Sequence, residues 1–128
     1  MSASEGLAWV GLGSNVDGPA ANVRAAFEAL EGIERTRCWA RSSLYASTPM
    51  GPPDQPLYVN AVAGLATELT PHELLRALHA IERQAGRERD GVRWGPRRLD
   101  LDLLALDART VADDELTLPH PGAGQRAF

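Results

Sequence analysis

The sequence contains one cysteine, Cys38, and no lysine. A single cysteine excludes an internal disulfide framework and a cysteine-based metal cluster. No apolar run approaches the roughly 18–20 residues that a membrane-spanning helix needs, so no membrane segment is expected. The first residues lack a basic stretch followed by a long apolar one and therefore do not resemble a secretory signal. These absences predict a cytoplasmic protein without a membrane partner.

The charge of the chain is modest and unevenly spread. The 128 residues carry a net charge of −4, and 44% of them are hydrophobic, which suits one globular domain over residues 1–128. Residues 83–98 hold six arginines against two acidic residues, so a basic segment interrupts an acidic chain. This pattern favours a local anion site over a protein that coats nucleic acid. Because lysine is missing everywhere, the choice of arginine adds nothing to this argument.

Hydrophobic periodicity predicts three strands and a helix in the first half of the chain. Residues 7–13 predict a buried strand, and residues 19–31 predict a helix with a proline in its first turn. Residues 35–47 and 58–67 predict two further strands. The segment 48–56 between them holds four prolines and cannot form regular structure.

A second helix and a last strand follow. Thr70 and Glu73 form a capping box around a proline, and Gly86 is expected to end the helix. A basic loop then leads to a strand over residues 99–106, and a tail without predicted structure closes the chain. The two helices carry apolar stripes of Val23, Ala26, Phe27 and Leu30 and of Leu74, Leu78, Ile81 and Ala85.

The element order is β-α-β-β-α-β. It predicts an α+β fold, a ferredoxin-like βαββαβ sandwich with a four-stranded antiparallel sheet and both helices packed on one face. The other face of the sheet stays open for a ligand. The fold by itself decides no function, because it hosts enzymes, RNA-binding modules and regulatory domains.

The last strand carries Asp100 and Asp102 at alternate positions, so both carboxylates point to one side while Leu101 and Leu103 point to the other. One interpretation is an amphipathic strand with a solvated face. The other is a cation site, because two close carboxylates repel each other unless a cation lies between them. Leu104 would share the face of the aspartates, which argues against a simply solvated edge. Mg²⁺ is often held by one or two carboxylates together with substrate phosphates.

Other segments leave two interpretations open. Residues 87–98 form either a solvated surface loop or a phosphate-binding lid, in which Trp94 supplies an aromatic face. Tyr58 and Asn60 share one face of their strand, where they either pack or recognise a flat heterocycle. "GLGSNVDG" after the first strand fails as a dinucleotide fingerprint, because Val16 replaces the third glycine.

Four segments, "GLGSN", "SSLYASTPMGPPDQPLYVNAV", "IERQAGRERDGVRWGPRRLDLDLL" and "LTLPHPGAGQRAF", resemble in this order the 6-hydroxymethyl-7,8-dihydropterin pyrophosphokinases of folate biosynthesis. The family fold agrees with the predicted element order. The resemblance implies that the chain transfers pyrophosphate from ATP to the hydroxymethyl group of 6-hydroxymethyl-7,8-dihydropterin and releases AMP. It also implies two Mg²⁺ ions bound with ATP.

The resemblance assigns roles by position. Asp100 and Asp102 match Mg²⁺ ligands, and Arg87 and Arg97 match catalytic arginines. The ATP-binding positions are His120, Arg126, Arg89, Trp94, Thr117 and Glu82. The pterin-binding positions are Ser47, Thr48, Met50, Tyr58, Asn60 and Phe128. His79 stands where the family has a glutamine, so its role stays open, and family members continue beyond the position of Phe128.

Two other classes of protein remain as alternatives. A ferredoxin-like RNA-binding module would use the open sheet face and the basic loop, but it usually has a basic balance and stacking aromatics on its strands. Trp9 and Tyr58 are the only strand candidates for such stacking. A metabolite-sensing regulatory domain would not need the paired aspartates. We therefore expect a monomeric enzyme without a nucleic-acid partner.

Overall fold

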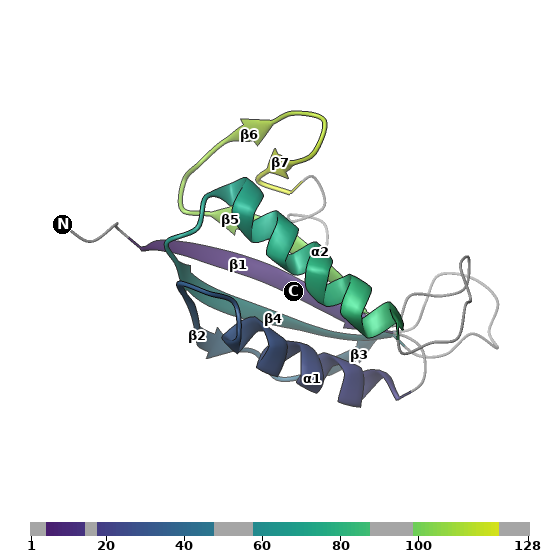
Figure 1. Cartoon of the computed structure of the whole chain (residues 1–128). Helices are drawn as coiled ribbons and strands as arrows, with labels where there is room; N and C mark the ends of the chain where they lie inside the picture. Colours follow the sequence, from purple (N-terminus) through teal and green to yellow (C-terminus); the bar gives the residue numbers. More distant parts are fainter. Residues whose placement is uncertain (1–4, 15–17, 48–57, 88–98, 121–128) are drawn as a thin grey trace.

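The computed structural model of the chain describes residues 5–14, 18–47, 58–87 and 99–120 (Figure 1). The elements in chain order are β1 (Gly6–Ser14), α1 (Pro19–Glu31), β2 (Thr36–Arg41), β3 (Tyr45–Ser47), β4 (Tyr58–Thr67), α2 (Pro71–Arg87), β5 (Asp100–Leu106), β6 (Val111–Ala112) and β7 (Thr117–Leu118). Both helices begin at the predicted prolines. α2 runs one residue past Gly86, because a glycine in a last turn weakens a helix without preventing it.

The main sheet is antiparallel, with the strand order β2-β4-β1-β5 and with β3 pairing to β4 beyond the end of β2. The predicted α+β class is confirmed, but the sheet has five strands because the strand expected over residues 35–47 is interrupted. Ser42 accounts for the interruption. Its hydroxyl accepts a hydrogen bond from the Val62 N–H at 2.8 Å, so a side-chain oxygen takes the place of a backbone carbonyl.

Both helices cover the same face of the sheet (Figure 1). On β1, Ala8, Val10 and Leu12 point into this layer and are at most 1% exposed. The predicted stripe of α1 is buried in full, whereas in α2 Leu74 and Leu78 are buried and Ile81 and Ala85 are half-buried. The core therefore lies between the helices and one face of the sheet. The strand residues that lie between these core positions in sequence belong to the opposite face.

The capping box of α2 is confirmed. The Thr70 N–H donates to Glu73 Oε1 at 2.9 Å, and the Glu73 N–H donates to Thr70 Oγ1 at 3.2 Å. The bond from the Thr70 N–H, and then the Thr70 hydroxyl, lower the pKa of the Glu73 carboxyl. The start of α2 is thus fixed by local chemistry. Among the described residues, no helix has both the length and the apolar character needed to cross a membrane.

A short hairpin, β6–β7, follows the sheet where the sequence predicted an unstructured tail. Leu116 and Leu118 bury their side chains in the main core. The His120 N–H donates to the Leu104 carbonyl at 2.8 Å, which fastens the end of the hairpin to β5. Two-residue strands have no stability alone, so this docking onto the core is what orders the hairpin.

Candidate functional site

The paired aspartates lie where the sequence predicted. Along β5, Asp100 and Asp102 are half-buried, and the alternating Leu101 and Leu103 are buried against the helices. The two carboxylates therefore belong to the sheet face that the helices leave uncovered. Leu104 is 7% exposed and stands outside the core cluster that contains Leu101 and Leu103. Val10 pairs with Leu103 and Trp9 pairs with Ala105, so Leu104 is an extra residue that interrupts the alternation, as in a β-bulge.

The strand register places polar residues from three strands in one row across the open face. Asn60 on β4 pairs with Gly13 on β1, and Gly13 pairs with Asp100 on β5. Tyr45 on β3 pairs with Asn60 and extends the row. Directly paired residues point to the same side of a sheet, and neighbouring strands lie about 5 Å apart, so Asn60 and Asp100 flank Gly13 at roughly 10 Å from each other.

At the centre of this face β1 contributes two buried glycines, Gly11 and Gly13, and no side chain. Gly11 pairs with Asp102 and Val62, just as Gly13 pairs with Asp100 and Asn60. A side chain at either glycine would stand between the β4 residues and the aspartates. Sequence reasoning missed this glycine floor, because the segment was interpreted only as a failed dinucleotide motif and as part of the family resemblance. The signal that reveals it is the alternation of side chains along a strand. Residues at every second position share a face, so Gly11 and Gly13 lie together on one face of β1, as Asp100 and Asp102 do on β5.

A hollow of about 280 Å³ lies at the outer edge of β5, and four residues that the sequence analysis considered for a site role line it. They are Asp102, Thr117, His120 and His79, which come from β5, the hairpin region and α2. His120 Nε2 lies 3.9 Å from Asp102 Oδ1. The hairpin thus brings Thr117 and His120 next to the aspartate strand.

The hollow also has an acidic wall that sequence reasoning missed. Asp113, Asp114 and Glu115 line it from the turn between β6 and β7. Asp113 Oδ1 accepts the N–H groups of Glu115 and Leu116, both at 2.9 Å, and these bonds are the main cause of the lowered pKa of Asp113. Only the docked hairpin puts this turn beside β5, so no local sequence signal identifies it.

Glu82 reaches β5 from α2. Its Oε2 accepts a hydrogen bond from the Leu101 N–H at 2.8 Å. The sequence prediction placed Glu82 at the nucleotide, and the structure adds this contact with the backbone between the two aspartates.

The remaining predicted residues are placed only in part. Ser47 and Tyr58 pair with each other across β3 and β4, and Arg87 is the last residue of α2. Seven predicted site residues lie outside the described residues: Thr48, Met50, Arg89, Trp94, Arg97, Arg126 and Phe128.

The aspartate pair can hold a hard cation only with help. Within the described ranges, no group of three or more His, Cys, Asp or Glu side chains converges on one point where a metal ion could bind. An ion at Asp100 and Asp102 would therefore complete its shell with water or with oxygens of a bound substrate, which is the usual arrangement for Mg²⁺ in nucleotide sites.

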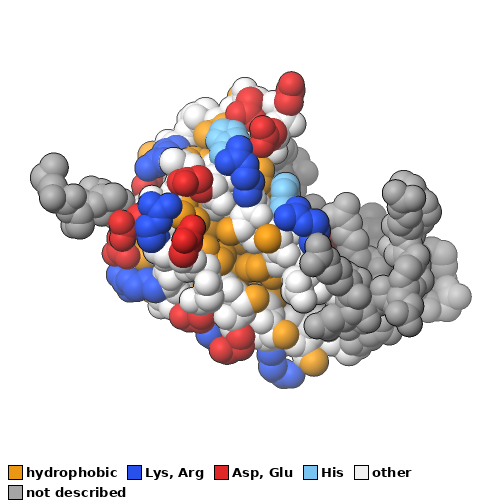
Figure 2. Space-filling model, viewed as in Figure 1, with side chains coloured by type: hydrophobic (Ala, Val, Ile, Leu, Met, Phe, Trp, Pro, Cys, Tyr) orange, Lys and Arg blue, Asp and Glu red, His pale blue; other side chains and the backbone are white. Residues whose placement is uncertain are grey.

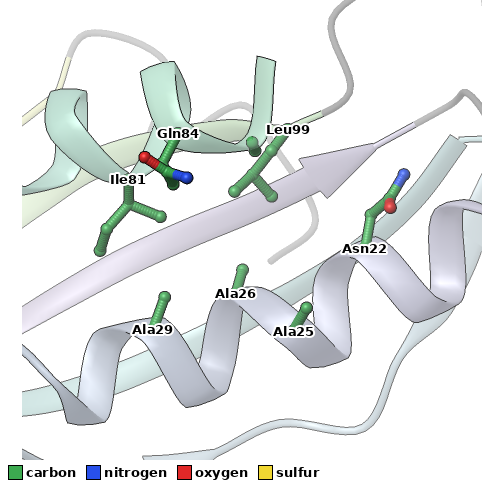
Figure 3. Close-up of a pocket in the computed structure, with 8 residues that line it drawn as sticks. Asn22, Ala25, Ala26, Ala29, Ile81, Gln84 and Leu99 are labelled. Carbon is green, nitrogen blue, oxygen red and sulfur yellow. The ribbon is translucent and has the colours of Figure 1, made fainter. Parts of the chain in front are cut away.

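A second hollow lies between α1 and α2, on the side of the sheet that the helices cover. Figure 2 shows hydrophobic side chains gathered there, and Figure 3 shows the small side chains that line it. Its volume is about 230 Å³, and its lining residues are Asn22, Ala25, Ala26, Ala29, Ile81, Gln84, Ala85 and Leu99. No ionisable side chain and no predicted site residue is among them, so this hollow does not suit phosphate or metal chemistry.

The fold and the site together define an α+β protein with paired carboxylates beside a polar hollow. Family comparison gives the particular kind. The model of the 7,8-dihydro-6-hydroxymethylpterin-pyrophosphokinase family matches residues 9–128. The chain belongs to this family, as its sequence motifs predicted.

Individual relatives agree with the family model. The chain is 48% identical over 120 residues to a 2-amino-4-hydroxy-6-hydroxymethyldihydropteridine pyrophosphokinase of Pseudomonas aeruginosa, and the match covers 94% of this chain and 74% of that protein. It is 44% identical over 121 residues to the protein of the same name from Haemophilus influenzae, with 94% and 75% covered. It is also 40% identical over 121 residues to a folate synthesis bifunctional protein of Arabidopsis thaliana, with 93% of this chain and 24% of that protein covered.

Proposed function

We propose that this chain transfers the pyrophosphoryl group of ATP to the hydroxymethyl group of 6-hydroxymethyl-7,8-dihydropterin, a step of folate biosynthesis. Membership of the family supports the reaction, and the named relatives carry the same activity in their names. The observation that carries the proposal in the structure is the pair Asp100 and Asp102 on the open face, beside the hollow that contains Thr117 and His120.

The reaction balances without a further reactant. The hydroxymethyl oxygen forms a bond to the β-phosphorus, and the bond from that phosphorus to the oxygen bridging to the α-phosphorus breaks. AMP leaves with the electron pair of the broken bond, and the hydroxyl proton is released. Little covalent chemistry is required of the protein, so catalysis rests on positioning and on compensation of charge.

The aspartates would serve as the cation ligands of this step. Two carboxylates on one face, each half-buried, offer the oxygen donors that Mg²⁺ prefers. Two bound Mg²⁺ ions would neutralise phosphate charge and polarise the β-phosphorus. Arg87 and Arg97 would compensate the charge that develops on the transferred group, because guanidinium groups bind phosphate oxygens in a bidentate manner.

The two substrates would approach from opposite sides of the glycine floor. Thr117, His120, Arg89, Trp94 and Arg126 would contact ATP. Ser47, Thr48, Met50, Tyr58, Asn60 and Phe128 would contact the pterin. Since Asn60 and Asp100 flank Gly13, this division leaves the hydroxymethyl group and the phosphates to meet next to Gly13.

We extend the proposal to the architecture and setting of the protein. β2 and β3 both pair with the same edge of β4, so we treat them as one interrupted strand. The sheet then corresponds to the four-stranded ferredoxin-like arrangement, in one domain over residues 1–128. The proposed protein is a cytoplasmic monomer with small-molecule substrates and no nucleic-acid or membrane partner.

The test is the conversion of ATP to AMP by the purified chain, with and without the pterin alcohol and with and without Mg²⁺. We expect AMP only when all components are present. Asp100→Asn and Asp102→Asn should each lower turnover at least about 100-fold, because each removes a charged oxygen ligand and keeps the shape. Glu34→Gln makes the same carboxylate-to-amide change in an exposed turn and should leave turnover intact. AMP formation at the normal rate by both aspartate variants would refute the proposed site.

A further inference from the structure

The outer edge of β5 is closed by side chains and loops in place of another main-sheet strand. β5 is the last strand in the order β2-β4-β1-β5, and its other edge pairs with β1. An edge strand exposes backbone N–H and C=O groups that need partners when they are buried. Here the Leu104 carbonyl receives the His120 N–H, and the Leu101 N–H is bound by the Glu82 carboxylate.

The Glu82 contact is made at a buried point of the strand. Leu101 is 4% exposed, belongs to the core and pairs with Leu12 of β1. Glu82 Oε2 lies 2.8 Å from the Leu101 nitrogen, and the bond is partly buried. A bond from an N–H to an ionised carboxylate is roughly twice as strong as a bond between neutral groups, so this contact fixes the Leu101 peptide firmly.

The position of this peptide matters because Leu101 separates Asp100 from Asp102. The separation and the direction of the two carboxylates depend on the strand twist at Leu101. A free edge would let this segment bend away from β1, whereas the bond to α2 holds it. Groups that orient the ligands of a metal site typically change metal affinity or activity about 10–100-fold when they are removed.

We infer that Glu82 is a positioning residue that acts through the Leu101 backbone and sets the geometry of the aspartate pair. This role needs an oxygen acceptor at position 82 and needs no negative charge there. It differs from a direct contact with ATP or with a cation, for which the charge itself would matter. The inference rests on the proposed function, because the aspartate geometry matters only if the pair binds the cation of that reaction.

Two substitutions at position 82 distinguish the need for an oxygen acceptor from the need for a negative charge. Glu82→Gln keeps an oxygen at the same reach and removes the charge, so it should lower turnover no more than about fivefold. Glu82→Ala removes the acceptor and should lower turnover about 10–100-fold and raise the Mg²⁺ concentration for half-maximal rate by a similar factor. Gln84→Ala, on the exposed side of the same helix, controls for loss of a long side chain from α2 and should change neither quantity.

Amide hydrogen exchange gives a readout that needs no substrate. The Leu101 amide should exchange slowly in the unsubstituted protein and in Glu82→Gln, and about tenfold or more faster in Glu82→Ala, whereas the Leu12 amide of β1 should stay protected in all three. Retained protection at Leu12 shows that Glu82→Ala still folds. The inference is overturned if Glu82→Ala keeps normal Leu101 protection and turnover. It is equally overturned if Glu82→Gln is as inactive as Glu82→Ala while its Leu101 amide stays protected.

These outcomes are distinct from failure of the proposed function. If the reaction itself is wrong, the unsubstituted chain forms no AMP under any Mg²⁺ concentration. If only the role of Glu82 is wrong, the unsubstituted chain is active and the substituted chains depart from the expected order.

Discussion

The open face of the sheet has two ends that differ in chemistry although the same strands build both. At one end, Trp9 and Trp39 are 40% and 44% exposed and pack edge to face, with ring centroids 5.2 Å apart at 67°. At the other end, Asn60, Asp100 and Asp102 surround a floor of glycines. Aromatic side chains fill the first end, whereas at the second end the central strand β1 carries no side chain.

Glycine serves opposite purposes at the two ends. At Gly64 an added Cβ would lie 2.9 Å from Trp39 Cε2 and 3.0 Å from Trp9 Cζ3, so glycine there makes room for tightly packed rings. At Gly13 glycine keeps the row between Asn60 and Asp100 clear. The comparison therefore predicts that a larger residue costs stability at one end and activity at the other.

Two irregularities in strand pairing lie between the aromatic end and the polar end of the open face. β5 gains an extra residue at Leu104, opposite Trp9 and Val10, and β2 shifts against β4 between Cys38 and Ala40. Bulges of this kind change the direction of side chains and are common next to active sites. They let the strands change from supporting a packed aromatic pair to carrying paired carboxylates within a few residues.

The largest effect is expected from Gly13→Val. The new side chain would stand between Asn60 and Asp100 and keep the two proposed substrates apart. Turnover should fall about 100-fold, since small displacements of reacting groups cost this much. Each substrate should still bind alone, and the presence of one should now weaken binding of the other, which calorimetry measures directly.

Ala105→Val is the matched control for that change. It adds two methyl groups to the same face, opposite Trp9 and outside the polar end. It should leave turnover unchanged. Gly13→Ala adds a smaller group and should give an intermediate loss of activity if crowding is the cause. Normal turnover in Gly13→Val would show that the two substrates do not meet next to Gly13.

Gly64→Ala is expected to act on stability and not on the turnover of the folded protein. The new methyl group must displace the Trp39 or Trp9 ring, and crowding of this kind costs about 1–3 kcal/mol. Urea denaturation measures the loss. Replacing Trp39 by alanine in the same chain should remove most of the penalty, because the closest contacts are with that ring. A penalty that is the same with and without Trp39 would place the strain elsewhere.

Much of this organisation was predictable from local patterns, and the rest depends on contacts between distant residues. The alternation of aspartate and leucine in the last core strand already put Asp100 and Asp102 on one face, and Thr70 and Glu73 predicted the start of α2. The pairing of Gly13 with Asn60 and Asp100 requires the sheet register, which no single segment contains.

The hairpin and the interrupted strand escaped prediction for physical reasons. β6 and β7 have two residues each and are stable only because Leu116 and Leu118 reach the core. The break between β2 and β3 depends on the Ser42 hydroxyl meeting Val62, which is 20 residues away in sequence. Bulges such as that at Leu104 leave no signature in hydrophobic periodicity, since the extra residue is itself apolar.

The smallest expected effect is on the stability of the β6–β7 hairpin, whose turn lines the hollow next to Asp102. The N–H groups of Glu115 and Leu116, and then His72, lower the pKa of Asp113. Since the folded-state pKa lies below the unfolded value of about 3.9, the stabilisation is present above that pH and is lost as the pH falls through the folded-state pKa. Asp113→Asn should therefore be less stable than the unsubstituted chain near neutral pH, and the difference should disappear in acid. Denaturation midpoints followed from neutral pH to well below the unfolded-state pKa test this. A difference that persists unchanged in acid would show that the Asp113 charge does not stabilise the hairpin, which would then be held by Leu116, Leu118 and the His120–Leu104 bond.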